Sequence, residues 1–381
     1  MQNFILRMPS ILAFGQDVLP RLGPAATVFG KRALVISESV LHEGHHVDRV
    51  VEILKRAGMD TMVYDELMPG TPAGAIDELA SLARASRTSV VVGLGGMRVL
   101  SVARAAANLA AEQLTIGNLF DGKVPERSLP YIEVPSSYRN HLMMRNEAVV
   151  KDGTAGRTRI ITLAPDTVKA VIVDTTFSQT LSSKYALAAI LDTLLAAIEG
   201  FFSTAGTLYS DTLLERAISE LHAAALMGVR NPSDVRFRYR AAEAGLLTAM
   251  GLGIAGQGLG GILSYVLNAR FSLPKSWVAT ILLPHVVDLL IPRNPEKAAQ
   301  VAAALGEPVE RIRAAEDAPR AARGVRKLLS QLDLPIRLRD LDVTHEELSG
   351  SAEEALEYQG LAAVPGGASA EDLQQLVSAA Y

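Results

Sequence analysis

The feature that most constrains the fold of this sequence is a change of pattern near residue 178 of its 381 residues. Before that point, short apolar runs rich in β-branched residues alternate with segments of helical spacing. After it, helical spacing continues almost to the C-terminus. Strand–helix alternation with nearly continuous apolar strands predicts a parallel sheet covered by helices on both faces. We therefore expect an α/β domain over residues 1–178 and an all-α domain over residues 179–381.

The strands predicted in the α/β domain cover residues 32–37, 61–64, 89–93, 131–135 and 171–174. Helices are predicted between them over residues 47–57, 75–85 and about 97–111. Turn-forming residues over 151–159 predict a hairpin. The helices predicted in the second domain cover residues 182–202, 209–228, 235–252, 260–268, 277–290, 295–305, 317–332 and 370–380.

The composition excludes several classes of protein. A hydrophobic content of 49% with 20% charged residues is typical of a globular chain. The net charge of −4 and the aromatic content of 5% argue against binding to nucleic acid or to an anionic membrane. The absence of cysteine excludes disulfides, thiolate metal sites and a cysteine nucleophile. Because the N-terminus lacks a secretory signal pattern, we expect a cytoplasmic protein.

One uncharged stretch, residues 244–269, is long enough to span a bilayer. It contains seven glycines as well as the polar residues Gln257 and Asn268, and charged amphipathic helices flank it. A helix that is apolar on all sides is also typical of a protein core. We therefore predict a buried helix pair here and no membrane span.

A glycine turn connects a predicted strand to the next helix, with the sequence Gly93-Leu-Gly95-Gly96-Met97-Arg98. Glycines at such a place let backbone amides approach a phosphate, and the helix N-terminus favours negative charge. The spacing differs from the common dinucleotide fingerprint. By itself the turn is therefore either a phosphate site or a tight connection.

Several motifs, in the same order along the chain, resemble those of the iron-dependent (group III) alcohol dehydrogenase family, which shares a dehydroquinate synthase-like fold. The glycine turn takes the place of the family segment Gly-Gly-Gly-Ser-x-x-Asp-x-x-Lys. Further matches are Phe14-Gly15, Pro135-Ser136-Ser137 in place of Pro-Thr-Thr, Leu282-Leu-Pro-His285, and the ending Glu371-Asp372 with Ala379-Ala380-Tyr381. The resemblance implies a Rossmann-like nucleotide-binding domain, an all-helical domain, an active cleft between them, and a homodimer.

The resemblance also implies NAD or NADP as cofactor. The residues it assigns to the cofactor are Gly95, Gly96, Arg98, Ser101, Glu38, Ser136 and Ser137. Met97 and Arg98 replace the family's third glycine and its serine, and Arg98 adds a cation that can pair with phosphate. Glu38 follows the strand over 32–37, where a carboxylate favours NAD over NADP; the alternative is a solvated loop acid.

The family holds a divalent metal with one aspartate and three histidines, and most of them are missing here. Asp192 keeps the aspartate, but the histidine positions hold Ala196, Gly261 and Lys275. A further family histidine near the substrate is replaced by Tyr265. One carboxylate cannot hold Fe²⁺ or Zn²⁺, which need several N or O ligands. We therefore predict that the protein has no catalytic metal.

Lys275 replaces a metal ligand in a site that keeps Asp192. A salt bridge between them can simply neutralise the former metal site. Alternatively, Lys275 supplies the positive charge that the metal carried, and burial makes a lysine a plausible acid, base or nucleophile. Tyr265 could then donate a proton to a carbonyl oxygen, with Asp192 orienting Lys275. This pairing resembles the Tyr/Lys chemistry of short-chain dehydrogenases but implies no shared fold.

The loop after Ser137 departs from the family segment Ala-Gly-Thr-Gly-Ser-Glu and reads Tyr138-Arg139-Asn140-His141-Leu142-Met143. Tyr138 and Arg139 are candidate substrate-binding residues, because an arginine can hold a carboxylate or phosphate. His141 is a candidate acid–base group. Each can equally be a packed or solvated loop residue.

Three functions are consistent with these residues. The first is a metal-independent NAD(P)-dependent oxidoreductase acting on a small alcohol or carbonyl compound. The second is a non-redox lyase, hydrolase or isomerase that uses Lys275, Tyr265 and His141. The third is a non-catalytic binding protein on a degenerate enzyme fold. We expect the first, with a small-molecule substrate.

Overall fold

A computed structural model describes residues 3–67, 73–310 and 313–381, and the chain divides into two compact units. The α/β unit comprises Arg7–Thr180, and the helical unit comprises Leu181–Tyr381 together with the short segment before Arg7. The sequence placed the boundary at residue 178 and assigned the N-terminal segment to the first domain. The N-terminal segment belongs to the helical unit because the ring of Phe4 stacks on Tyr209, with ring centroids 6.0 Å apart.

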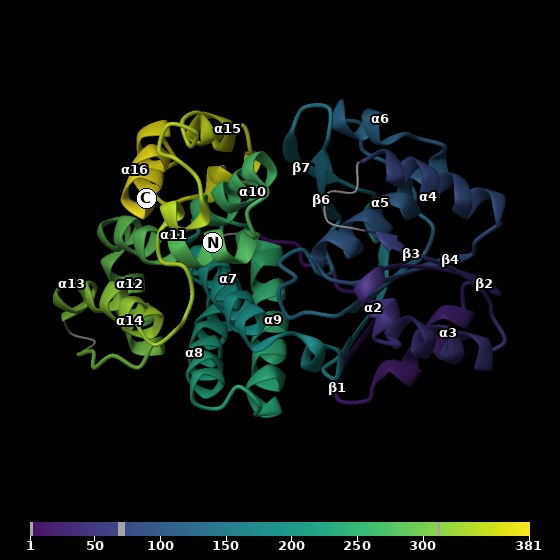
Figure 1. The fold of residues 1–381 in the computed structure, drawn as a ribbon, viewed down its shortest axis with the longest axis horizontal. Helices are drawn as coiled ribbons and strands as arrows, with labels where there is room; N and C mark the ends of the chain where they lie inside the picture. Colours follow the sequence, from purple (N-terminus) through teal and green to yellow (C-terminus); the bar gives the residue numbers. More distant parts are fainter. Residues whose placement is uncertain (1–2, 68–72, 311–312) are drawn as a thin grey trace. The chain divides into compact units, whose positions relative to one another are not determined.

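The α/β unit is built on a parallel six-stranded sheet with strand order β1-β8-β5-β4-β2-β3 (Figure 1). The strands are β1 (Ile11–Gly15), β2 (Arg32–Glu38), β3 (Asp60–Leu67), β4 (Val90–Gly95), β5 (Tyr131–Pro135) and β8 (Val168–Asp174). Every residue of β4 and β5 is buried. This burial explains why the central strands read as uninterrupted apolar runs. The predicted parallel sheet is confirmed.

Helices of the α/β unit connect most of its strands, and one short 3-10 helix, η2, follows the last strand. They are η1 (Leu19–Arg21), α1 (Leu22–Thr27), α2 (Ser39–Glu43), α3 (His46–Arg56), α4 (Gly74–Ala85), α5 (Met97–Glu112), α6 (Ile116–Phe120) and η2 (Phe177–Thr180). An antiparallel pair, β6 (Glu147–Asp152) and β7 (Arg157–Thr162), forms the predicted hairpin. The helix α5 packs on β4, β5 and β6, and thereby joins the hairpin to the sheet.

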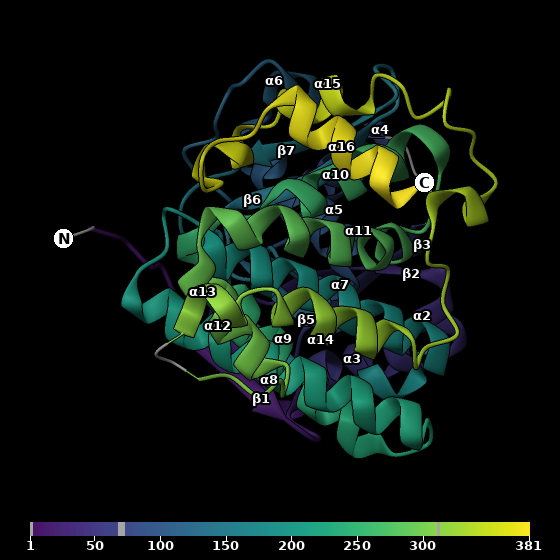
Figure 2. The same ribbon diagram turned by 90° about the vertical axis from the view of Figure 1, so that its left-hand side faces the viewer.

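The helical unit contains, among its described residues, helices in the second half of the chain and no strand (Figures 1 and 2). They are α7 (Ser183–Phe202), α8 (Leu208–Arg230), α9 (Val235–Ala255), α10 (Leu259–Phe271), α11 (Lys275–Leu290), η3 (Ile291–Arg293), α12 (Pro295–Ala304), α13 (Ala314–Asp317), α14 (Arg320–Leu329), η5 (Leu338–Leu341), α15 (Ser351–Leu356), η6 (Gln359–Ala363) and α16 (Ala370–Ala380). α11 contacts α7, α10, α14 and α16, so it lies at the centre of the unit.

Several boundaries differ from the predicted ones for local reasons. The predicted helix over 317–332 is two helices, α13 and α14, and Pro319 stands at the N-cap of α14. α11 begins at Lys275 and not at residue 277, because Pro274 occupies its N-cap with φ −60°. β1 and the short helices after residue 337 were not predicted, since each is too short to show a clear period.

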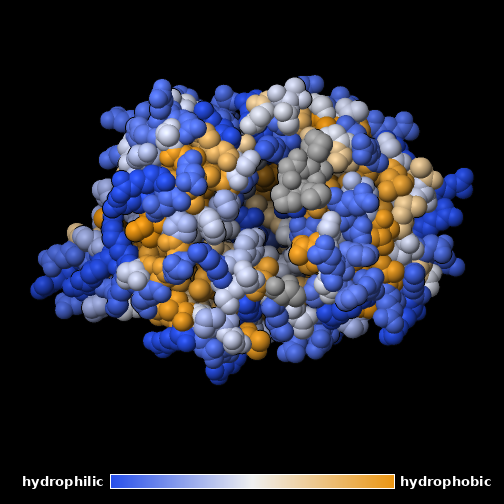
Figure 3. Space-filling model, in the orientation of Figure 1, coloured by the Kyte–Doolittle hydropathy of each residue, from blue (hydrophilic) through white to orange (hydrophobic). Residues whose placement is uncertain are grey.

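Among the residues that the structure describes, two helices are long and apolar enough to cross a membrane by length and composition: α7, and α11 extended to Arg293. The pair α9 and α10 passes the same test together but is bent by 103° at Gly256 to Gly258. In α7, 89% of the apolar window is buried inside the unit. On the face in Figure 3, hydrophilic residues are interspersed with hydrophobic patches.

Candidate functional site

A buried lysine–aspartate pair is the chemical centre of the helical unit. The ammonium nitrogen Nζ of Lys275 lies 2.5 Å from Oδ1 of Asp192. The Lys275 side chain is 6% exposed and that of Asp192 is fully buried. The hydroxyl of Ser276 donates to the other oxygen, Oδ2, at 3.0 Å. The carboxylate therefore receives a charged donor on one oxygen and a neutral donor on the other.

The packing of the start of α11 against the middle of α7 explains why these groups meet. Lys275 and Ser276 are the first residues of α11, and Asp192 lies in the middle of α7, which packs against α11. A cation at a helix N-terminus is opposed by the helix dipole. Two isolated charges could not be buried here, so each stabilises the other. The sequence predicted this pairing from the retained Asp192 and the new Lys275.

Tyr265 joins the same cluster from α10. The Nζ of Lys275 lies 4.8 Å from the centroid of the Tyr265 ring, a cation–π contact, and Tyr265 is 3% exposed. The ring face is thus turned toward the ammonium. Three of the four predicted catalytic residues are therefore together, while His141 lies in the α/β unit.

Glu199 is a neighbouring group that the sequence did not single out. It lies on α7, two turns after Asp192, and its carboxylate accepts hydrogen bonds from the backbone N–H of Gly260 (2.6 Å) and Gly261 (3.0 Å). Burial raises the pKa of Glu199 to about 7, although these hydrogen bonds and the charge of Lys275 oppose the rise. The signal that could have identified it was its spacing from Asp192 on one helix face.

The other two positions that the resemblance assigns to metal ligands carry no donor atom in their side chains. Ala196 lies buried on α7, and Gly261 lies in the first turn of α10. A β-carbon added to Gly261 would lie 3.2 Å from Oε2 of Glu199. A larger side chain at Gly261 would therefore displace the carboxylate that holds the start of α10.

In the α/β unit, the glycine turn follows β4 and begins α5. Gly93 packs so closely that an added β-carbon would lie 2.5 Å from the hydroxyl of Tyr131, whereas one on Gly96 would meet nothing within 4 Å. Gly96 is the N-cap of α5, and Met97 is buried at the first helical position. Gly93 is thus required by packing, and Gly96 leaves open space above the start of the helix.

Arg98 and Glu38, both predicted cofactor residues, form an ion pair with 2.8 Å between Nη2 and Oε2. Ser101 is also a predicted cofactor residue, but it is 1% exposed and its hydroxyl accepts a hydrogen bond from the N–H of Val149 at 3.1 Å. Its visible function is to attach β6 to α5. A cofactor contact by Ser101 stays a prediction.

A second buried ion pair, Arg104 with Glu133, was not predicted as a site. Both side chains are at most 1% exposed. The guanidinium of Arg104 also donates to the backbone carbonyls of Leu142 (3.0 Å), Arg145 (2.9 Å) and Glu147. Glu133 accepts from the N–H of Met144 at 3.1 Å. This clamp fixes residues 142–147, which form the end of the loop after Ser137 and the segment that follows it.

The loop itself is largely packed. Tyr138 and His141 are 3% and 1% exposed, whereas Arg139 is partly exposed. Ser136 donates its N–H to the carbonyl of Gly95 at 3.0 Å, and the hydroxyl of Ser137 accepts from the N–H of Arg139 at 3.2 Å. These bonds connect the loop to the glycine turn. The roles of the loop side chains toward cofactor or substrate stay predictions.

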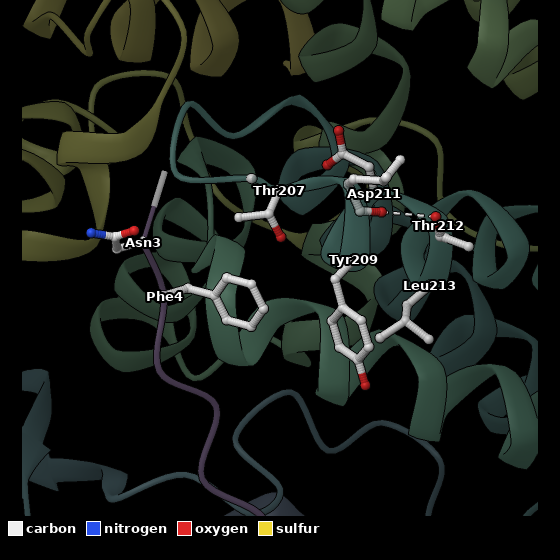
Figure 4. A pocket seen from close by; sticks show the side chains of 9 residues that line it. Asn3, Phe4, Thr207, Tyr209, Asp211, Thr212 and Leu213 are labelled. Atoms are coloured by element: carbon white, nitrogen blue, oxygen red, sulfur yellow. Dashed lines mark hydrogen bonds between the residues drawn. The ribbon is translucent and has the colours of Figure 1, made fainter. Parts of the chain in front are cut away.

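A separate groove of about 810 Å³ lies on the helical unit, at the start of α8 (Figure 4). The rings of Phe4 and Tyr209 lie along it, beside Thr207, Asp211 and Thr212. Asp211 is paired with Lys297 at 2.8 Å. The groove therefore offers aromatic rings, hydroxyls and one carboxylate that is already paired, and it carries no assigned chemistry among the described residues.

Two family descriptions match the chain. Residues 9–175 match "Iron-containing alcohol dehydrogenase", and residues 186–381 match "Fe-containing alcohol dehydrogenase family, C-terminal". The long-chain-alcohol dehydrogenase 1 of Geobacillus thermodenitrificans (strain NG80-2) is 24% identical over 362 residues, covering 93% of this chain and 91% of that protein. The lactaldehyde reductase of Escherichia coli (strain K12) is 23% identical over 357 residues, covering 92% of each.

Solved structures share the same fold. A 1,3-propanediol oxidoreductase superimposes with a TM-score of 0.94 at 20% identity, over 100% of both chains. A sulfoacetaldehyde reductase from Bifidobacterium kashiwanohense in complex with NAD+ gives 0.85 at 17% identity, over 100% of this chain and 98% of that one. The two family matches together cover nearly the whole sequence and confirm the predicted resemblance. The chain belongs to the iron-containing alcohol dehydrogenase family.

Proposed function

We propose that this member of the family is an NAD(P)-dependent oxidoreductase that interconverts a small alcohol and its carbonyl compound without a metal ion. Family membership supports oxidoreductase chemistry on small alcohols. The observation that carries the metal-free part is the position of the Lys275 ammonium, 2.5 Å from Asp192 in a buried site. In this reading the lysine supplies the positive charge at the place where the family has its metal.

The residues present do not fit a divalent metal ion. Of the four positions that the family uses, one has a carboxylate, two have no donor atom and one has an ammonium group. A second cation beside Asp192 would be repelled by Lys275 at the same carboxylate oxygen. Among the described residues, no group of three His, Asp or Glu side chains could hold a metal. We therefore assign no step to a metal.

Lys275 and Asp192 can perform the acid–base part of the reaction. A bound reduced nicotinamide cofactor would supply the hydride to the carbonyl carbon. As the carbonyl oxygen gains the displaced electron pair, Lys275 stabilises its negative charge and donates a proton to it. Solvent then returns a proton to the amine. Asp192 keeps the ammonium in place through the cycle, and the Tyr265 ring shields one side of it from water.

The α/β unit provides residues suited to the cofactor. Gly96 leaves open space at the start of α5, where the helix dipole favours phosphate. Ser136 and Ser137 follow β5 next to this turn, because Ser136 is hydrogen-bonded to Gly95. We propose that these residues, with Gly95, bind NAD or NADP. Arg139 is the residue that we propose to hold an acidic group on the substrate.

We also propose that the protein works in the cytoplasm as a homodimer on a small-molecule substrate. We assign α7 and α11 to the protein core and not to a membrane, because 89% and 67% of their apolar windows are buried. The net charge of −4 argues against nucleic acid as a partner. Light scattering after size-exclusion chromatography would measure the dimer, and a monomer at micromolar concentration would contradict it.

The deciding experiment is a titration of EDTA-treated protein with NADH and NADPH, followed by nicotinamide fluorescence. We expect saturable binding without metal, and then turnover with small aldehydes that added Fe²⁺ or Zn²⁺ does not increase. Turnover that appears only after metal is returned would contradict metal independence. A lack of binding at millimolar nucleotide would contradict the redox proposal and favour a lyase, hydrolase or isomerase.

A further inference from the structure

The order of the strands locates a crevice at the carboxyl edge of the sheet in the α/β unit. From β2 the chain proceeds to β3 on one side, and from β4 it proceeds to β5 on the other side. Because β2 and β4 are adjacent, the connections after them diverge. Ligands of open α/β sheets bind at such a switch point. Here the switch point lies between the ends of β2 and β4.

Arg98 and Glu38 meet at this crevice. Glu38 is the last residue of β2, and Arg98 is the second residue of α5, which follows β4. Their ion pair is 2.8 Å long, with the arginine side chain 37% exposed and the glutamate 20% exposed. The hydroxyl of Ser37 donates to the carbonyl of Leu94 at 2.9 Å and holds the two strand ends together. The pair therefore crosses the opening of the crevice.

We infer that Arg98 admits the 2′-phosphate of NADP(H), so that the protein accepts NADP(H) at least as well as NAD(H). This inference rests on the proposed function, because it assumes that a nicotinamide dinucleotide binds at the switch point. A carboxylate alone at the end of β2 accepts a hydrogen bond from the ribose 2′-hydroxyl and repels a 2′-phosphate. Glu38 is not alone, since Arg98 neutralises it in direct contact.

The chemistry of the guanidinium determines which of the two cofactors binds more tightly. Arginine donates two parallel hydrogen bonds to a phosphate and keeps its charge at any physiological pH. The Arg98 side chain is 37% exposed, so its guanidinium can turn toward a phosphate, and the Glu38 carboxylate that it leaves is 20% exposed to water. NADH gains no such contact at its 2′-hydroxyl. Arg98 therefore favours the phosphorylated cofactor, and Glu38 offsets part of that preference.

The test compares dissociation constants of NADH and NADPH in four proteins: wild type, Arg98→Gln, Glu38→Gln and Arg56→Gln. Arg56 forms an exposed ion pair with Glu52 on α3 of the same unit, so its variant controls for the loss of one surface arginine. We expect Arg98→Gln to weaken the binding of NADPH about 10-fold to 100-fold relative to that of NADH, the range for one hydrogen bond to a charged group. Arg56→Gln should leave the ratio unchanged.

Glu38→Gln should change the ratio of the two dissociation constants in the opposite direction, in favour of NADPH, because a negative charge is removed from beside the 2′-phosphate. Thermal unfolding of each variant checks that the fold is kept. If both cofactors bind and Arg98→Gln leaves their ratio unchanged, the inference is wrong while the proposed function stands. If the wild-type protein binds neither nucleotide, the proposed function is wrong and the inference with it.

Discussion

Two buried ion pairs among the described residues are similar in burial but differ in the groups that surround the cation. In the α/β unit, Arg104 spreads its donors over Glu133 and three backbone carbonyls. In the helical unit, the ammonium of Lys275 contacts the carboxylate of Asp192 and lies over the Tyr265 ring. A guanidinium that binds several fixed carbonyls is a structural clamp. A lysine ammonium carries protons that it can transfer, which is the role that we propose for Lys275.

The first prediction separates chemistry from stability at Lys275. Lys275→Met leaves Asp192 buried and uncompensated, and we expect kcat/KM for carbonyl reduction to fall by about 100-fold to 10,000-fold. Unfolding free energy should fall by about 3–5 kcal/mol as well, because one member of a buried pair is lost. Urea unfolding and initial rates with NADH or NADPH measure the two effects.

The control is the double variant Asp192→Asn/Lys275→Met, which removes both charges. It should recover most of the stability, since neither partner is left as an unpaired charge. Activity should stay low, because the proton donor is still absent. Full activity in the double variant would show that Lys275 and Asp192 only fill the former metal site.

The second prediction concerns the clamp. Arg104→Met should lower the unfolding free energy by about 3–5 kcal/mol, because Glu133 is left charged and fully buried. Arg104→Lys keeps the charge but cannot reach all the carbonyls, so its loss should be about 1–3 kcal/mol. Urea denaturation of both variants measures the difference. Equal losses would mean that the retained positive charge stabilises nothing and that the carbonyl contacts account for the whole effect.

The third prediction tests whether the helical site exchanges a proton near neutral pH. Burial raises the pKa of Glu199 from 4.5 to about 7. Between these values the folded protein keeps a proton that the unfolded chain has lost. The stability from this proton is full below about pH 4.5 and is lost as pH rises to about 7, by about 3 kcal/mol in total.

Glu199→Gln removes this titration and keeps one of the two oxygens that accept from the N–H groups of Gly260 and Gly261, so any cost of the lost acceptor is the same at every pH. The stability difference between wild type and variant should therefore change across this pH range, and parallel pH profiles would contradict the assignment.

Near the clamp, burial and Glu133 raise the pKa of Tyr131 well above its usual value. Tyr131 should therefore stay protonated throughout the experiment.

The sequence predicted the parallel sheet and the helical half because their hydrophobic periods are long and consistent. It also identified Lys275, Tyr265 and Asp192 as one group, through their places in family motifs. It could not reveal that Arg98 pairs with Glu38, since 60 residues separate them and only the strand order brings them together. A pattern of residue types does not encode which distant groups in the sequence a side chain will contact after folding.

Ser101 illustrates the same limit. Its place in the glycine-rich motif predicts a cofactor contact, which stays a prediction, but no motif indicated that its hydroxyl accepts from the backbone N–H of Val149 and attaches the β6–β7 hairpin to α5. Glu199 was missed because a glutamate in an apolar helix has no motif of its own. Its importance follows from the two N–H groups of α10 that it accepts, which only the folded chain brings within reach.

The smallest predicted effects come from removing a single serine hydroxyl in each of the two units. Ser276→Ala removes a hydrogen bond to the buried carboxylate of Asp192 and should cost about 1.5–3 kcal/mol, the range for bonds to charged groups. Ser101→Ala removes a neutral hydrogen bond to the N–H of Val149 and should cost about 1 kcal/mol. Equal costs in urea unfolding would show that Asp192 carries no more charge than an ordinary acceptor. A larger cost at Ser276, with a reduced kcat, would indicate that the serine helps Asp192 hold the Lys275 ammonium in its reactive position.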